Sequence, residues 1–204
     1  MTESEVQADG SWSPGLGAND VQLLLEIVGD TLKWSLSGDA ASFSFDAYAR
    51  GSALDQRLGN FVTLYHAAEL RGCIGTLYAT EKLYLSAHEN TVHAAHEDRR
   101  FKSIEEGDLN RITYTVSVLS ELREIESLSD FRLGAQGLSL RLHDRSAVFL
   151  PSVPIEQKWD ARQTAEGLCR KAGLPLDAWQ EDSARFEVFD SVVYASMQAG
   201  ADDA

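Results

Sequence analysis

The chain has 204 residues, 44% of them hydrophobic and 25% charged, which is ordinary for a soluble globular protein with a real core. With 18 basic and 32 acidic residues, the formal net charge is −14, and a field of this sign disfavours nucleic acid as a general partner. No apolar run approaches the roughly 18 residues of a membrane span, and the acidic N-terminus is unlike a signal peptide, so we expect a cytoplasmic protein without membrane contact.

The two ends of the chain differ in composition from the part between them. Residues 1–17 are polar, with glycines and a proline, and predict a flexible acidic tail. Residues 197–204 predict a second flexible tail at the C-terminus. Residues 18–196 are therefore expected to form a single domain.

Three segments have the apolar spacing of amphipathic helices. The first is expected to begin at a cap by Asn19, and its stripe consists of Val21, Leu24, Leu25, Val28, Leu32 and Leu36. Residues 37–60 are then expected to be mostly loop. Thr80 can cap a second helix that runs to about Glu97. Asp160 can cap a third helix, which Gly173 and Pro175 end.

Alternating apolar and polar residues predict the strands. The alternation is strongest in residues 112–119, where Ile112, Tyr114, Val116 and Val118 share one face. Further strands are predicted at 61–65, 69–74, 138–142, 147–150 and 185–195, with turns at 66–68 and 144–146. Strands joined by hairpins, with helices set between them, predict an α+β fold with a mostly antiparallel sheet flanked by helices.

One of the two cysteines lies in the hexapeptide Leu70-Arg71-Gly72-Cys73-Ile74-Gly75. Glycine has no Cβ, so a ligand can come close to the thiol, and a nearby arginine favours the reactive thiolate. Regular alternation would place Leu70, Gly72 and Ile74 on one face of the strand and Arg71, Cys73 and Gly75 on the other. Arg71 and Cys73 would then lie side by side, about 6.6 Å apart.

Cys73 has two interpretations. It is either a buried structural residue, as many free cysteines are, or a reactive thiolate in an electropositive setting. A nucleophilic thiol usually needs a base, which Arg71 cannot supply, so the candidates are His66, His143 or a carboxylate such as Asp98. Alternatively, Asp98 forms an internal ion pair with Arg100.

Other chemistry-bearing residues point to structure instead. Val92 occupies the place of the second histidine in a His-Glu-x-x-His zinc motif, so no metal is expected from the three histidines of the second helix, His88, His93 and His96. Cys169 lies on the apolar stripe of the third helix and is expected in the core. Trp159 and Trp179 flank that helix and are expected to pack against it.

Several short motifs follow one another along the chain. They are Phe61–Leu64, Leu70–Gly75, Asp98–Phe101, Val116–Ser120, Gly137–Leu138, Leu150–Val153, Trp159–Asp160 and Lys171–Leu174. Together they resemble the AMMECR1 domain family over nearly the whole chain. The resemblance implies an antiparallel sheet flanked by helices with a smaller helical and strand lobe. It also implies partners, because bacterial and archaeal relatives occur in a three-part system with a radical SAM protein and a Memo-like protein.

The chain departs from the family pattern at three positions. Arg99 stands where the family has proline, Gln136 where a histidine is common, and Ser152 where glutamine or glutamate is frequent. Arg71, Cys73 and Arg100 match the family.

Two functions are compatible with these residues. The first is a thiol-dependent enzyme or redox component, with Cys73 and Arg71 as catalytic residues and an anionic or carbonyl small-molecule substrate. Its substrate-binding residues would be Gly72, Gly75, Asp98 and Arg100, without a metal or another cofactor. The alternative is a non-catalytic adaptor in which the Cys73 hairpin is structural or forms a recognition surface.

Overall fold

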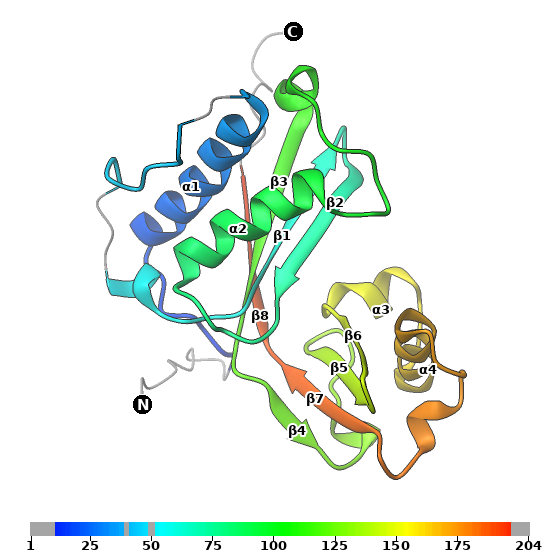
Figure 1. The fold of residues 1–204 in the computed structure, drawn as a ribbon. Helices are drawn as coiled ribbons and strands as arrows, with labels where there is room; N and C mark the ends of the chain where they lie inside the picture. Colours follow the sequence, from blue (N-terminus) through cyan, green and yellow to red (C-terminus); the bar gives the residue numbers. More distant parts are fainter. Residues whose placement is uncertain (1–10, 39–40, 49–51, 197–204) are drawn as a thin grey trace, which may run out of the picture. The chain divides into compact units, whose positions relative to one another are not determined.

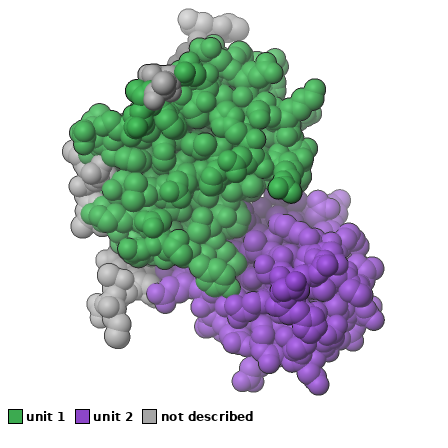
Figure 2. Space-filling model, in the orientation of Figure 1, with its two compact units in different colours: residues 1–5, 13–119, 192–204 green, residues 6–12, 120–191 purple. Residues whose placement is uncertain are grey.

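The computed structural model describes residues 11–38, 41–48 and 52–196, which form two compact units (Figures 1 and 2). Among these residues, unit 1 comprises 13–38, 41–48, 52–119 and 192–196, and unit 2 comprises 11–12 and 120–191. Each unit has its own four-stranded sheet with helices packed on it. The predicted α+β class, mostly antiparallel and with a smaller lobe, is confirmed.

The sheet of unit 1 has the strand order β2-β1-β3-β8. Its strands are β1 (Asn60–His66), β2 (Glu69–Thr76), β3 (Ile112–Leu119) and β8 (Ser191–Ala195). The β1–β2 and β1–β3 pairs are antiparallel, and β2 forms one edge of the sheet. The predicted strand 112–119 is confirmed, because Val116 and Val118 are fully buried on one face, as the alternation requires.

Helices α1 (Ala18–Leu36) and α2 (Leu83–His96) lie on the same face of this sheet (Figure 1). Both begin away from their predicted caps. Helix α1 starts after Gly17, whose N–H donates to Asp20 at 3.0 Å, and Asn19 lies inside the first turn. Helix α2 starts after Lys82, two residues later than a Thr80 cap predicts.

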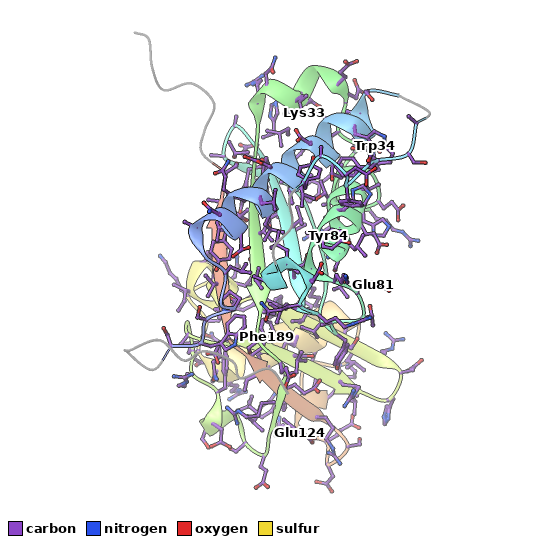
Figure 3. All side chains as sticks on the ribbon, turned by 90° about the vertical axis from the view of Figure 1, so that its left-hand side faces the viewer. Lys33, Trp34, Glu81, Tyr84, Glu124 and Phe189 are labelled. Atoms are coloured by element: carbon purple, nitrogen blue, oxygen red, sulfur yellow. The ribbon has the colours of Figure 1, made fainter. Side chains whose placement is uncertain are left out.

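Side chains link α2 to β1 and link both helices to segment 41–48. The Asn60 amide donates to Ser86 Oγ at 2.9 Å, and the Asn90 amide donates to Asn60 Oδ1 at 2.9 Å, so this buried polar group is internally paired. Trp34 of α1 and Tyr84 of α2, both labelled in Figure 3, contact the rings of segment 41–48. Part of the predicted 37–60 loop is therefore anchored to both helices, while its residues 39–40 and 49–51 lie outside the described residues.

Unit 2 has the strand order β4-β7-β5-β6. Its strands are β4 (Arg123–Ile125), β5 (Gly137–Leu142), β6 (Arg145–Phe149) and β7 (Arg185–Phe189), and its helices are α3 (Ser152–Glu156) and α4 (Ala161–Ala172). Asp160 caps α4 by accepting from the Gln163 N–H at 2.7 Å, and Gly173 ends it at φ 69°, as predicted. The predicted single strand 185–195 is wrong, because Asp190 separates β7 from β8 and the two strands join different sheets.

Short 3-10 turns complete the described chain. They are η1 (Ser52–Asp55), η2 (Glu106–Arg111), η3 (Leu128–Asp130) and η4 (Ala178–Gln180). The β5–β6 turn comprises His143 and Asp144, one residue earlier than the predicted 144–146 turn. Among the described residues, no helix has the length and apolar character of a membrane span.

Only residues 11–17 of the predicted tails lie within the described residues. Residues 1–10 and 197–204 lie outside the described residues. Pro14 is buried, and its carbonyl accepts a hydrogen bond from the Gln56 side chain at 3.3 Å. Ordered chain in unit 1 thus begins before the predicted boundary at residue 18. Compact units need not fold independently, so the single domain over 18–196 stays a prediction.

Candidate functional site

A β-bulge at Arg71 decides which way Cys73 points. The β1–β2 ladder starts at His66↔Glu69 and Tyr65↔Leu70, then skips Arg71 and continues with Leu64↔Gly72 and Thr63↔Cys73. An uninterrupted ladder would pair Cys73 with Val62, which is fully buried on the face that the helices cover. The bulge instead moves Cys73 to the opposite face, where its side chain is half-buried.

The prediction that Leu70, Gly72 and Ile74 share one face is therefore wrong for Leu70. Because the bulge inserts one residue, Leu70 lies on the same face as Cys73 and is 41% exposed. Gly72 and Ile74 remain together on the helix-covered face. The predicted side-by-side placement of Arg71 and Cys73 fails for the same reason.

Cys73 lies opposite Thr63 on the face of the hairpin that the helices do not cover. The Thr63 hydroxyl donates to Cys73 Sγ at 3.3 Å, and Thr63 itself is only 6% exposed. The Cys73 N–H points to the outer edge of β2 and donates to Asp98 Oδ2 at 2.9 Å, while the Cys73 carbonyl accepts from Arg100 Nη2 at 3.3 Å. Sequence reasoning missed Thr63, because only the bulged register places it opposite the thiol.

Asp98 and Arg100 form the ion pair that the sequence left as an alternative. Arg100 donates from Nε to Asp98 Oδ1 at 2.9 Å and from Nη2 to Oδ2 at 2.6 Å. Hydrogen bonding by Arg100 holds the pKa of the Asp98 carboxyl at about 2, below its usual 3.8, although burial opposes the shift. Asp98 is thus a permanently charged brace and a poor proton acceptor near neutral pH.

The guanidinium of Arg100 also interacts with the Cys73 side chain. Its pKa is raised, chiefly by the hydrogen bond to Asp98 and further by interaction with the Cys73 side chain, while burial opposes the shift. The Arg100 side chain remains 57% exposed. Arg100 therefore contacts the buried Asp98 carboxylate and the Cys73 backbone, and it also interacts electrostatically with the Cys73 sulfur.

Arg71 ties the bulge to the segment that carries Asp98 and Arg100. Its guanidinium donates to the carbonyls of Lys102 and Ser103, the latter at 3.0 Å. The Ser103 hydroxyl in turn donates to the His96 carbonyl at the end of α2 at 3.3 Å. Segment 98–103 is thereby fixed to the edge of β2 at two points, and Arg71 supports the site from its rim.

Close packing explains why both of these positions in the hexapeptide are glycine. A Cβ on Gly72 would lie 2.1 Å from the Ala94 carbonyl oxygen of α2, and one on Gly75 would lie 2.2 Å from the Phe61 ring. Neighbouring protein atoms thus occupy the space that each missing side chain leaves. Their predicted part in substrate binding stays a prediction.

The two histidines proposed as bases have other partners. His66 Nε2 lies 3.9 Å from Asp108 Oδ1, and its position in the ladder puts it on the face opposite to Cys73. His143 belongs to the β5–β6 turn of unit 2, where its Nε2 lies 3.7 Å from Glu181 Oε2. Neither is placed by these contacts to take a proton from Cys73.

The histidines of α2 have three separate environments. His88 Nδ1 lies 2.8 Å from Thr31 Oγ1 between aromatic rings, and burial lowers its pKa. His93 Nε2 lies 3.9 Å from Glu97 Oε1, and His96 Nε2 is buried without a hydrogen-bond partner among the described residues. In the part of the chain that the structure describes, no three His, Cys, Asp or Glu residues are arranged to hold a metal.

The remaining predicted residues lie in or around the core of unit 2. Cys169 is fully buried, as predicted, and burial raises the pKa of its thiol. Trp159 packs on Phe149, with ring centroids 5.7 Å apart, and Trp179 borders the same core. Gln136, where the family often has histidine, is 3% exposed and accepts from the Arg132 N–H at 3.0 Å.

The fold and site define an α+β protein of two sheets, whose half-buried thiol is aimed by a β-bulge and braced by a buried Asp–Arg pair. The chain belongs to the AMMECR1 family, because the family model matches residues 29–194. A Methanocella arvoryzae protein is 30% identical over 164 residues, covering 77% of this chain and 83% of the relative. A Methanothermobacter thermautotrophicus protein is 35% identical over 145 residues, covering 68% and 76%.

A solved structure has the same fold. It is the crystal structure of an uncharacterized protein from Pyrococcus horikoshii, with a TM-score of 0.76 and 26% sequence identity. The match covers 83% of this chain and 88% of that protein. The architecture is therefore not peculiar to this sequence.

Proposed function

We propose that this protein is a cytoplasmic thiol-dependent enzyme in which Cys73 is the nucleophile. One observation carries the proposal: Thr63 donates to Cys73 Sγ while Arg100, braced by buried Asp98, adds positive charge beside the same sulfur. Hydrogen-bond donors and cations next to sulfur favour the thiolate, which is the reactive form. The bulge supports the proposal, because β-bulges often re-aim side chains near active sites.

The chemical step is a substitution at an electrophilic carbon. The thiol proton passes to solvent, since Arg100 keeps Asp98 charged and His66 lies on the opposite face of the sheet. Cys73 Sγ then forms a bond to the carbon, and the electron pair of the bond that breaks departs with the leaving group. Arg100 stabilises the thiolate before attack, and Thr63 orients it.

Alkylation of the native protein by iodoacetamide at a series of pH values tests this function, with Cys73→Ser as the blank. The expected result is rapid labelling of Cys73 in the native protein at neutral pH. Thr63→Val should slow this labelling, whereas Thr63→Ser, which keeps the hydroxyl, should not. Labelling that occurs only after denaturation would overturn the proposal and favour the adaptor alternative.

Family membership motivates a second element of the proposal, namely Memo-like and radical SAM proteins as partners. Co-purification of these proteins from a host that encodes all three is the direct test. Cys73→Ser should leave such a complex intact, because the substitution changes one atom of a half-buried side chain. Absence of both proteins from the purified material would refute this element without affecting the thiol chemistry.

A further inference from the structure

Four basic residues lie on β2 or on segment 98–102, which is hydrogen-bonded to β2 at Cys73, in a protein that is otherwise strongly acidic. They are Arg71, Arg99, Arg100 and Lys102, and we refer to them as the basic cluster. Segment 98–102 lies along the outer edge of β2, where Arg100 bonds the Cys73 carbonyl and Arg71 bonds the Lys102 carbonyl. A local positive field on a chain of net charge −14 is therefore concentrated at the thiol.

Acidic groups in the same segments offset only part of this charge. Asp98 is buried and already paired with Arg100. Glu97 lies 3.9 Å from His93, and Glu69 is at the far end of β2, next to the turn. Four cations against the carboxylates of Glu97 and Asp98 leave the edge beside Cys73 with a net positive charge.

Part of the basic cluster has unused hydrogen-bonding capacity. Arg100 donates to protein acceptors from N, Nε and Nη2, but within the described ranges no acceptor takes its Nη1. Arg99 and Lys102 are exposed, and among the described residues neither forms an ion pair. An incoming anion would find the Arg100 donor already positioned, because Asp98 fixes its guanidinium.

We propose that the Cys73 site takes a small substrate with a carboxylate or phosphate group, which Arg100 Nη1 binds beside Sγ in the field of Arg99 and Lys102. The inference rests on the proposed nucleophilic function and adds the substrate class. A planar guanidinium with fixed orientation suits both oxyanions. The group would be held next to the sulfur, so that its electrophilic carbon lies within reach of Sγ.

A pair of alkylating reagents of nearly equal shape tests the charge preference. Iodoacetate is anionic and iodoacetamide is neutral, and both react by forming an S–C bond as iodide leaves with the electron pair. Their rate ratio cancels any change in the amount of thiolate. At low salt we expect the iodoacetate-to-iodoacetamide ratio for Cys73 to exceed that of a small free thiol by about tenfold. In 1 M salt, where the Debye length is about 3 Å, most of this excess should disappear.

Charge-removing variants locate the preference. Arg100→Gln and Lys102→Gln should each lower the rate ratio several-fold. Lys33→Gln removes one charge from an exposed side chain of α1. It is the matched control and should leave the ratio unchanged. Protection of Cys73 from iodoacetamide by sodium phosphate would identify phosphate as the bound group, whereas protection by sodium acetate would identify carboxylate.

The outcomes separate this inference from the function on which it rests. If neither reagent labels the native protein, the nucleophilic function and the anion site both fail. If both reagents label rapidly, but the ratio equals that of a small thiol and does not respond to salt or to Arg100→Gln, the nucleophile stands and the anion site is overturned. If Lys33→Gln lowers the ratio as much as Lys102→Gln does, the effect comes from net charge and the local site is likewise overturned.

Discussion

Each unit contains a hairpin, and the two hairpins are similar in their turns but differ in where they place their side chains. Both hairpins have two-residue turns with positive φ, at Ala67 (50°) and Ala68 (70°) in unit 1 and at His143 (55°) in unit 2. In both, an arginine of the second strand donates to two consecutive carbonyls at or after the C-terminal end of a helix. Arg71 donates to Lys102 and Ser103, and Arg145 donates to Ala172 and Gly173.

The hairpins differ in their ladders. The β5–β6 register is continuous from Leu138↔Phe149 to Leu142↔Arg145, and its alternating leucines are all buried. The β1–β2 register skips Arg71, so the residues beyond the bulge exchange faces. A regular ladder therefore builds a core in unit 2, whereas one extra residue in unit 1 moves a thiol out of a core position.

The largest effect on stability is expected from adding a side chain at Gly72, where α2 lies directly on the bulged hairpin. A Cβ at Gly72 would lie 2.1 Å from the Ala94 backbone oxygen, which cannot rotate away. Gly72→Ala should lower the free energy of unfolding by about 3 kcal/mol in urea titrations. Gly107→Ala, where no atom lies within 4 Å of the new Cβ, is the control. Equal stability of the two variants would contradict the packing role of Gly72.

Removing the charge of Asp98 should have the next largest effect. Its folded-state pKa of about 2 lies below its usual 3.8, so the carboxylate stabilises the protein above about pH 4, and this contribution is lost as the pH falls through 2. Asp98→Asn should therefore cost about 2 kcal/mol at pH 7. Urea titrations between pH 3 and 7 should show the gap between variant and wild type narrowing toward acid. A gap that does not change with pH would show that the charge is not responsible.

The two cysteines extend the comparison to single atoms. Cys169 is fully buried on α4, and a hydroxyl in its place would lose its hydration, so Cys169→Ser should cost about 1–2 kcal/mol. Cys73→Ser, at a half-buried position next to a hydroxyl donor, should change stability by less than about 0.5 kcal/mol. Thermal denaturation of both variants checks the difference. A reversed order would mean that Cys73 is the packed thiol.

The two arginine substitutions should have modest effects on stability and should give the most informative contrast. Arg71→Gln and Arg145→Gln should each cost about 1 kcal/mol, because each removes hydrogen bonds from a charged donor near the surface. Only Arg71→Gln should also slow iodoacetamide labelling of Cys73, since segment 98–103 would loosen from β2. Stopped labelling reactions followed by mass spectrometry measure this. An equal slowing in Arg145→Gln would remove the distinction between the hairpins.

Local chemistry made some elements predictable. The alternation in residues 112–119 and the capping pair Asp160 and Gly173 gave the right strand and helix, because each signal lies within the element that it describes. The fully buried position of Cys169 followed from its place on an apolar stripe. The helix starts at Asn19 and Thr80 failed, because several polar residues precede each helix and propensity does not choose among them.

The candidate site itself was only half predictable. The sequence by itself determined its ingredients: a cysteine next to glycine and close to an arginine, an Asp–Arg pair that begins 25 residues later, and the hairpin that carries the thiol. Tertiary structure alone decided that Arg71 forms a bulge, that Thr63 faces the sulfur, and that Arg100 rather than Arg71 supplies the adjacent charge. Strand register depends on contacts with residues that are distant in the sequence, here α2 above Gly72 and segment 98–103 at the edge of β2. The two-residue periodicity of a strand does not encode these contacts.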